Sequence, residues 1–191
     1  ARSADVRSAP AALPERFELG RFLGRGGAGV VYEVFDRTRG EWVALKAVQV
    51  ADPDAIYRLK REFRSLCQLE HPNLVRLLDL FVDGETCFFT MELAEGQDFL
   101  TFCSRIDEGT DLEDAGGHDE APPYDEARLR EALRGLATGV AALHSHGLLH
   151  RDLKPSNVRV TPDGRVVLLD FGLATDAHAA ALQTHGVAGT V

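Results

Sequence analysis

The chain has 191 residues, 45% of them apolar, and carries 21 lysine and arginine residues against 30 aspartate and glutamate residues, a formal net charge of −9. This length suits one domain or two small lobes, and the acidic balance argues against general nucleic-acid binding, which needs a basic face. No apolar run is long enough for a membrane-spanning helix or a signal peptide, and three scattered cysteines, Cys67, Cys87 and Cys103, predict a reducing, cytoplasmic setting.

The first half of the chain predicts a small sheet with one helix. Residues 1–14 show no sustained period and are interpreted as a flexible lead-in. Alternating β-branched and aromatic residues from Phe17 to about Val50 predict three antiparallel strands, and two more are predicted over residues 74–80 and 86–93. Between them, apolar residues recur at steps of three and four, which predicts a helix that ends before Pro72: Ile56, Leu59, Phe63, Leu66 and Leu69.

The second half predicts helices and one hairpin. A short helix is expected near residues 99–103, followed by an acidic, glycine-rich segment, 104–123, that is typical of an exposed loop or of a docking surface for a basic partner. Residues 104–127 hold nine acids and one arginine, a net charge of −8. A long helix follows, with Asp125 and Glu126 at its positive N-terminal end. Its predicted core face consists of Leu129, Leu133, Leu136, Val140 and Leu143.

A glycine cluster, Gly24-Arg-Gly26-Gly-Ala-Gly29, fits the pattern G-x-G-x-x-G. A dinucleotide-binding fold needs a helix directly after this pattern, but residues 30–35 are typical of a strand. The glycines are therefore expected at a hairpin tip, where bare backbone N–H groups can close over phosphates. An ordinary glycine-rich turn is the alternative interpretation.

Lys46 stands in an otherwise apolar strand, residues 43–48, and is one of only three lysines in the chain. Strand alternation places Ala44, Lys46 and Val48 on one face. A buried ammonium needs an anionic partner, and Glu62 on the following helix is a candidate. In isolation, a solvated lysine and a solvated glutamate remain the alternative.

The segment His150-Arg-Asp152-Leu-Lys154-Pro-Ser-Asn157 precedes a hairpin signal at Asp163-Gly164 and then Asp170-Phe-Gly172. A turn centred between residues 163 and 164 pairs positions whose numbers sum to 327, which predicts that Asn157 faces Asp170. Amide and carboxylate oxygens suit a hard cation such as Mg²⁺.

In this order and spacing, the segments from about Phe17 to Thr190 resemble the signature set of the protein kinases. The resemblance implies an α+β, bilobal fold. Its N-terminal lobe, residues 15–94, has a five-stranded antiparallel sheet and one helix, with a hinge near 91–94. Its mainly helical C-terminal lobe is incomplete here and spans residues 95–191, with a catalytic loop at 150–157 and an activation segment at 170–191.

The resemblance also implies an ATP site. The backbone of the glycine cluster covers the phosphates (Gly24, Arg25, Gly26, Gly27 and Gly29). Val31 and Ala44 form an apolar ceiling over adenine, and the hinge residues Met91, Glu92 and Ala94 read its edge. Lys46, held by Glu62, pairs with the α- and β-phosphates.

Catalytic roles follow from the same resemblance. Asp152 accepts or orients the substrate hydroxyl, Lys154 meets the γ-phosphate, and Asn157 and Asp170 hold Mg²⁺. The loop resembles that of serine/threonine kinases, so protein serines and threonines are the expected acceptors. Arg151 beside Asp152 is typical of kinases regulated by activation-loop phosphorylation, expected on Thr184, with Thr175 as second choice, and a homodimer could phosphorylate itself in trans.

The chain ends at Val191, before the Ala-Pro-Glu motif and the later helices of that family, so the sequence is expected to be a fragment. An inactive, nucleotide-binding scaffold and a small-molecule kinase on the same fold are the competing hypotheses. The arginine-, alanine- and glycine-rich composition resembles bacterial members of the family.

Overall fold

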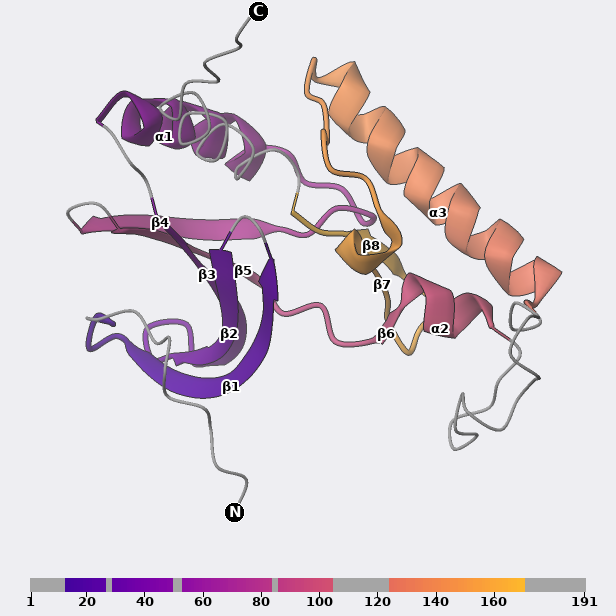
Figure 1. Ribbon diagram of the computed structural model, residues 1–191, viewed down its shortest axis with the longest axis horizontal. Coiled ribbons are helices and arrows are strands. Elements are labelled where there is room, and N and C mark those ends of the chain that lie inside the picture. The colour runs from indigo at the N-terminus through magenta and orange to yellow at the C-terminus, as the bar shows by residue number, and fades with distance from the viewer. Residues whose placement is uncertain (1–12, 27–28, 50–52, 84–85, 105–123, 171–191) are drawn as a thin grey trace, which may run out of the picture. The chain divides into compact units, whose positions relative to one another are not determined.

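The computed structural model describes residues 13–26, 29–49, 53–83, 86–104 and 124–170 (Figure 1). The chain divides into two compact units. The first unit consists of Ala1–Glu70, Arg76–Leu93 and Asp170–Val191, and the second of His71–Val75 and Ala94–Leu169. Within the described ranges, no helix has both the length and the apolar character needed to cross a membrane.

The first unit is a five-stranded antiparallel sheet with one helix, as predicted. Its sheet has the order β1-β2-β3-β5-β4. The strands are β1 (Phe17–Gly26), β2 (Gly29–Asp36), β3 (Glu41–Gln49), β4 (Leu77–Asp83) and β5 (Thr86–Glu92), and the helix is α1 (Pro53–Cys67). The strand predicted from Leu74 begins only at Leu77, because Leu74 forms a parallel bridge with Leu168 in the second unit.

The central strand β3 is buried on both faces. One face packs into a core cluster that is made by four strands: Phe17, Tyr32, Val34, Val43, Leu45 and Phe88. The other face carries Ala44, Lys46 and Val48, which are also buried. On that side α1 packs against the sheet, with the rings of Phe63 and Phe89 6.0 Å apart. The predicted alternation of β3 is therefore confirmed, and it places Lys46 inside the unit.

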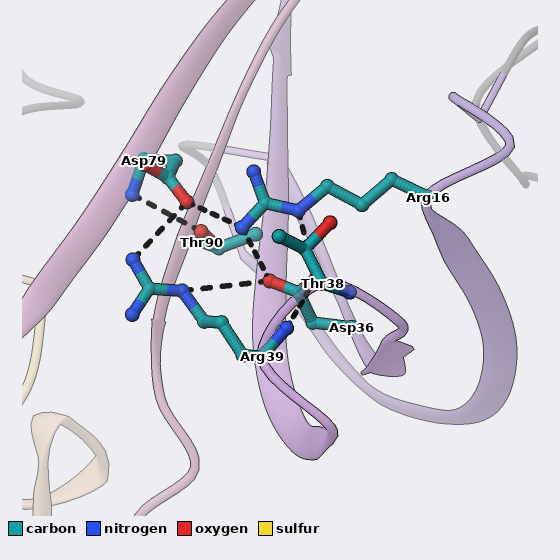
Figure 2. Close-up of polar contacts among 6 residues, drawn as sticks. All are labelled: Arg16, Asp36, Thr38, Arg39, Asp79 and Thr90. Carbon is teal, nitrogen blue, oxygen red and sulfur yellow. Dashed lines mark hydrogen bonds and ion pairs between the residues drawn. The ribbon is translucent and has the colours of Figure 1, made fainter.

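A charged cluster links the two edge strands of this sheet, β1 and β4 (Figure 2). Arg16, directly before β1, donates from Nε to Asp36 Oδ1 at 2.8 Å and from one terminal nitrogen to Asp36 Oδ2 at 2.5 Å. The same nitrogen lies 2.7 Å from Asp79 Oδ2 on β4, and Arg39 contacts that oxygen at 3.3 Å. The Asp36 side chain is fully buried. Arg16 therefore ties the end of β2 to the far edge of the sheet.

Aromatic rings continue the same junction. Phe17 on β1 contacts Phe81 on β4 edge-on, with ring centroids 5.4 Å apart, and Phe81 stacks on Phe88 of β5. The Arg16 guanidinium lies over both Phe17 and Phe81, at 5.1 and 5.7 Å from the ring centroids. Ionic, cation–π and apolar contacts thus act at one place to hold the curled sheet closed.

The environment of Asp36 favours its ionised form. The hydrogen bonds from Arg16 lower the pKa of this carboxyl most, burial opposes them, and the backbone N–H groups of Thr38 and Arg39 lower it further. The same contacts raise the pKa of Arg16. Because the folded-state pKa lies below the ordinary aspartate value of about 4, the pair stabilises the fold above that pH and loses its effect as the pH falls through the lowered pKa.

We expect Asp36→Asn to lower the free energy of unfolding by about 3 kcal/mol, because it removes the fully buried carboxylate of the pair and leaves the partly buried Arg16 with Asp79 alone. Thermal unfolding at several pH values tests this. The difference in Tm from the wild type should be constant near neutral pH and shrink as the pH falls below about 4.

Glu18→Gln is the matched control, since Glu18 pairs with Arg37 and both side chains are about 60% exposed. An Asp36→Asn protein as stable as this control would contradict a structural role for the junction.

In its described residues, the second unit combines a three-stranded sheet with two α-helices and a short 3₁₀ helix (Figure 1). Its elements are β6 (Gln97–Asp98), α2 (Phe99–Cys103), α3 (Glu126–Ser145), the 3₁₀ helix η1 (Pro155–Asn157), β7 (Val158–Val160) and β8 (Val166–Leu168). Asp98 caps α2 by accepting from Thr101 N, and Asp125 caps α3 by accepting from Ala127 N and Arg128 N. Both predicted helices are confirmed.

The predicted core face of α3 is wrong in part. The buried residues are Ala132, Gly139 and Leu143, whereas Leu133 is 47% exposed. The helix packs through its small residues because the backbone of Asn73 lies directly against it: a Cβ at Gly139 would meet Asn73 O at 2.8 Å. The leucine periodicity predicted the helix correctly, but it did not predict which side of the helix packs against Asn73.

Asn73 anchors the segment 71–75 between α3 and β8. Its Nδ2 donates to Val166 O at 2.7 Å, and its own carbonyl accepts from Leu168 N at 2.9 Å. Val75 N then donates to Leu168 O at 3.0 Å. The segment therefore extends the small sheet by one short bridge beyond β8.

We expect Gly139→Ala to destabilise the protein by on the order of 1 kcal/mol, although alanine is the better helix former by a similar amount. The added methyl group meets the backbone carbonyl of Asn73, which accepts a hydrogen bond from Leu168 N, while the Asn73 side chain is held by Val166 O. Ala141→Gly at an exposed position of α3 measures the propensity effect alone. A Gly139→Ala protein with a higher Tm than the wild type would show that Asn73 moves away freely.

Candidate functional site

Lys46 and Asp170 form an ion pair within the first unit, with Nζ 2.8 Å from Oδ1. Lys46 is paired in the sheet with Val31 on one side and Phe89 on the other, and its side chain is 4% exposed. A buried ammonium requires such an anion. The sequence predicts Glu62 as the anionic partner of Lys46. Glu62 lies half-buried on α1, and its pairing with Lys46 stays a prediction.

The glycine cluster lies at the β1–β2 hairpin tip, as expected. Gly24 pairs with Val31 and Gly26 with Gly29, whereas Gly27 lies outside the described residues. Gly29 has a φ of +135°, and a Cβ there would overlap Ala47 O, so local packing alone requires this glycine. A Cβ at Gly24 would meet no atom within 4 Å. Packing in the described chain therefore does not explain Gly24, which leaves open space beside the strand.

Most of the residues predicted to contact adenine lie on neighbouring strands of the first unit. Ala44 on β3 pairs with Met91 on β5, and both are buried, while Val31 on β2 is half-buried. Glu92 ends β5 and donates its backbone N–H to Arg76 O at 2.9 Å. Ala94 belongs to the second unit.

A second group of charged residues surrounds Asp152 in the second unit. Lys154 Nζ lies 2.7 Å from Asp152 Oδ2. Asn157 Nδ2 donates to the same carboxylate oxygen at 3.1 Å and to the backbone O of Asp152 at 2.7 Å. Because its N–H groups are directed at Asp152, Asn157 retains its amide oxygen as the atom that can ligate a cation.

The carboxylate of Asp152 is stabilised in its ionised form. The hydrogen bond from Lys154 lowers its pKa most, burial opposes this, and the hydrogen bond from Asn157 lowers it further. Asp152 is therefore ionised at neutral pH and can accept a hydrogen bond from a hydroxyl group.

His150, the first residue of the motif that resembles the protein kinases, orients this loop. The ring is buried, its Nε2 lies 2.8 Å from Leu169 O, and Asp152 N donates to its Nδ1 at 3.3 Å. Since Nδ1 accepts, the proton belongs on Nε2, which donates to Leu169 O. The signal available in the sequence was only its place two residues before Asp152.

Backbone strain marks the same residues. Among the described residues, the two non-glycine positions with positive φ are Arg151, at 63°, and Asp170, at 54°. Such conformations cost on the order of 1–3 kcal/mol and persist where surrounding contacts impose them. Arg151 directly precedes Asp152 in the second unit, and Asp170 is itself the partner of Lys46 in the first.

The predicted register of the β7–β8 hairpin is wrong by one residue. Val158 pairs with Leu168 and Val160 with Val166, and Leu169 N donates to Asn157 O at 2.7 Å. The loop has three residues between Thr161 and Arg165, with Gly164 at a φ of +82°, rather than the two-residue turn assumed from the sequence. Asn157 therefore faces Leu169, and Asp170 is the next residue along.

Thr175 and Thr184 lie outside the described residues, so their predicted phosphorylation stays a prediction. The cysteines Cys67, Cys87 and Cys103 are all free, and burial raises the pKa of each thiol. They are therefore poor nucleophiles.

Comparison with known proteins identifies the family. The family model described as protein kinase domain matches residues 17–191. CBL-interacting protein kinase 22 of Oryza sativa subsp. japonica is 35% identical over 199 residues, which cover 93% of this chain and 41% of that protein. Serine/threonine-protein kinase PknA of Mycobacterium tuberculosis (strain ATCC 25618 / H37Rv) is 33% identical over 190 residues, which cover 93% of this chain and 40% of that protein.

A solved structure agrees with these sequence relatives. The crystal structure of a variant of the Mycobacterium tuberculosis PknI kinase domain matches with a TM-score of 0.65 at 27% identity, and covers 88% of this chain and 64% of that one. The chain thus spans about two fifths of the length of the two curated relatives and about two thirds of the solved domain. With its two-unit architecture and its charged loop, this chain belongs to the protein kinase domain family.

Proposed function

We propose that this chain acts in an ATP-dependent protein serine/threonine kinase, which transfers the γ-phosphoryl group of Mg-ATP to serine and threonine hydroxyls. The observation that carries the proposal is the ionised Asp152, held by Lys154 and Asn157, in a loop whose backbone is strained at Arg151. A carboxylate in this state can orient the attacking hydroxyl and accept its proton.

Features of the first unit support ATP as the donor. The open space at Gly24 is the kind of backbone approach that a phosphate group needs, and Lys46 supplies a buried cation. Ala44 and Val31 supply small apolar contacts on the same face as Lys46. Glu62 is the proposed second partner of Lys46, and Met91, Glu92 and Ala94 are the proposed contacts of the adenine edge.

Mg²⁺ is the cation that suits the proposed oxygen donors, the carboxylate of Asp170 and the amide oxygen of Asn157. When bound, it neutralises charge on the transferred phosphoryl group. Lys46 holds the Asp170 carboxylate in place in the first unit, and Asp152 holds the Asn157 amide in the second.

The acceptor class is tested by incubating this chain, and a version extended through the later helices of the family, with radiolabelled ATP, Mg²⁺ and a generic basic protein. Transfer by the extended version alone would also support the kinase. We expect label on serine and threonine. ATP binding without any transfer would favour the inactive scaffold, and transfer to a small hydroxyl compound but not to protein would favour the small-molecule kinase.

Two substitutions separate chemistry from nucleotide binding. We expect Asp152→Asn to lower phosphoryl transfer by about 10²- to 10⁴-fold while ATP affinity changes little, because it removes the base and keeps the shape. Asp170→Ala should instead abolish the Mg²⁺-dependent part of ATP binding, measured by calorimetry. Asp163→Asn, in the exposed β7–β8 turn, is the matched control.

Normal transfer by Asp152→Asn would show that another group is the base. Full Mg²⁺-ATP affinity in Asp170→Ala would contradict the metal assignment, and Asp170→Asn with a thermal unfolding scan separates this result from a loss of folding.

Regulation is proposed to occur through phosphorylation of Thr184, with Thr175 as second choice, in trans within a homodimer. Arg151, an exposed cation next to Asp152, supports this because it can bind a phosphate group. We expect phosphopeptide mapping of an active preparation to find phosphate on Thr184. An active preparation without phosphate there would exclude the site.

The cellular setting proposed is the cytoplasm of a bacterium, in a signalling role. The three free cysteines support a reducing compartment, and the preference for arginine over lysine resembles bacterial members of the family.

A further inference from the structure

The outer face of α1 is basic in a chain whose net charge is −9. The helix carries four cations, Arg58, Lys60, Arg61 and Arg64, and two acids, Asp54 and Glu62. Asp54 lies in the first turn, where the positive end of the helix stabilises it. The rest of the helix therefore presents a clear excess of positive charge.

An exposed stripe concentrates this charge. Tyr57, Arg61 and Arg64 recur at steps of four and three residues, so they share one side of the helix. All three are exposed, and Tyr57 has 68% of its surface accessible to solvent. The opposite side packs into the unit through Leu59 and Phe63. The stripe is about 10 Å long, a span of about three residues of extended chain.

The chemistry of this stripe is that of a protein-binding surface. Tyrosine and arginine are the residue types most enriched at the energetic centres of interfaces. Neither Arg61 nor Arg64 has an ion-pair partner among the residues that the structure describes. Both guanidinium groups can therefore bind carboxylates in the planar, bidentate arrangement that arginine favours.

We propose that the outer face of α1 is a docking surface for an acidic segment of a partner protein. Aspartate or glutamate carboxylates of that segment bind Arg61 and Arg64, and an intervening side chain packs on Tyr57. Charge complementarity selects the partner, since α1 carries four cations against two acids and attracts an acidic segment to this surface. The surface is separate from Lys46, which points into the unit from β3.

The test is a fluorescence-anisotropy titration with a labelled ten-residue glutamate-rich peptide at low salt. We expect one-to-one binding that weakens at least tenfold in Arg61→Glu/Arg64→Glu. The matched control, Arg130→Glu/Arg134→Glu on exposed positions of α3, lowers the net charge by the same amount and should change affinity less than twofold. Tyr57→Ala should weaken binding severalfold, and raising the salt concentration should weaken it in the wild type.

Three results would overturn the proposal: no binding of the peptide at low salt, equal losses in the α1 and α3 variants, or a salt-sensitive dimer of this chain that the α1 variant abolishes. The last result would make a second copy the occupant. Thermal unfolding of each variant confirms that it is folded. Neither double variant changes Lys46, Asp152 or Asp170, so nucleotide binding is unaffected. The outcome of the peptide test is therefore independent of the test of the kinase proposal.

Discussion

The buried contact between Arg16 and Asp36 is the constraint on which the first unit depends. A curled sheet whose edge strands did not meet would leave the face that carries Val43 and Leu45 open to water. Arg16 joins the end of β2 to Asp79 on β4 (Figure 2). The ring of Phe17 packs on Phe81 at the same junction. In these low-dielectric surroundings an unpaired charge is costly. The complete pair therefore favours the one arrangement of the strands in which Arg16 meets Asp36.

Burial of β3 on both faces follows from that closure. This burial determines the kind of partner that Lys46 requires. An ammonium in this position is stable only with an anion nearby, which Asp170 supplies at 2.8 Å. In the second unit, Asp152 is held in a comparable way, by Lys154 and Asn157. Each unit thus holds one carboxylate beside a neighbouring donor, Asp170 beside Lys46 and Asp152 beside Lys154 and Asn157.

The two sides of α1 differ in charge and in exposure to solvent. Its apolar side contributes Phe63 to the packing on β5, whereas Arg61 and Arg64 remain in solvent beside Tyr57. Arginine is suited to this surface because its planar group recognises carboxylates, while the compact ammonium of Lys46 suits a buried position.

The sequence alone determined the strands of the first unit and the helices, because strand alternation and helical periodicity are local properties. Motif spacing is local too, and it supplied the residues of the proposed site. Only the tertiary structure decided which side of α3 is buried, that Leu74 leaves β4 to bridge Leu168, and that Asp170 pairs with Lys46. The predicted register of the β7–β8 hairpin was wrong for a related reason. One additional loop residue shifts every pair of the two strands, and the loop length depends on the backbone conformation of Gly164. These features depend on contacts between residues distant in the chain or on backbone conformation, which residue spacing does not encode.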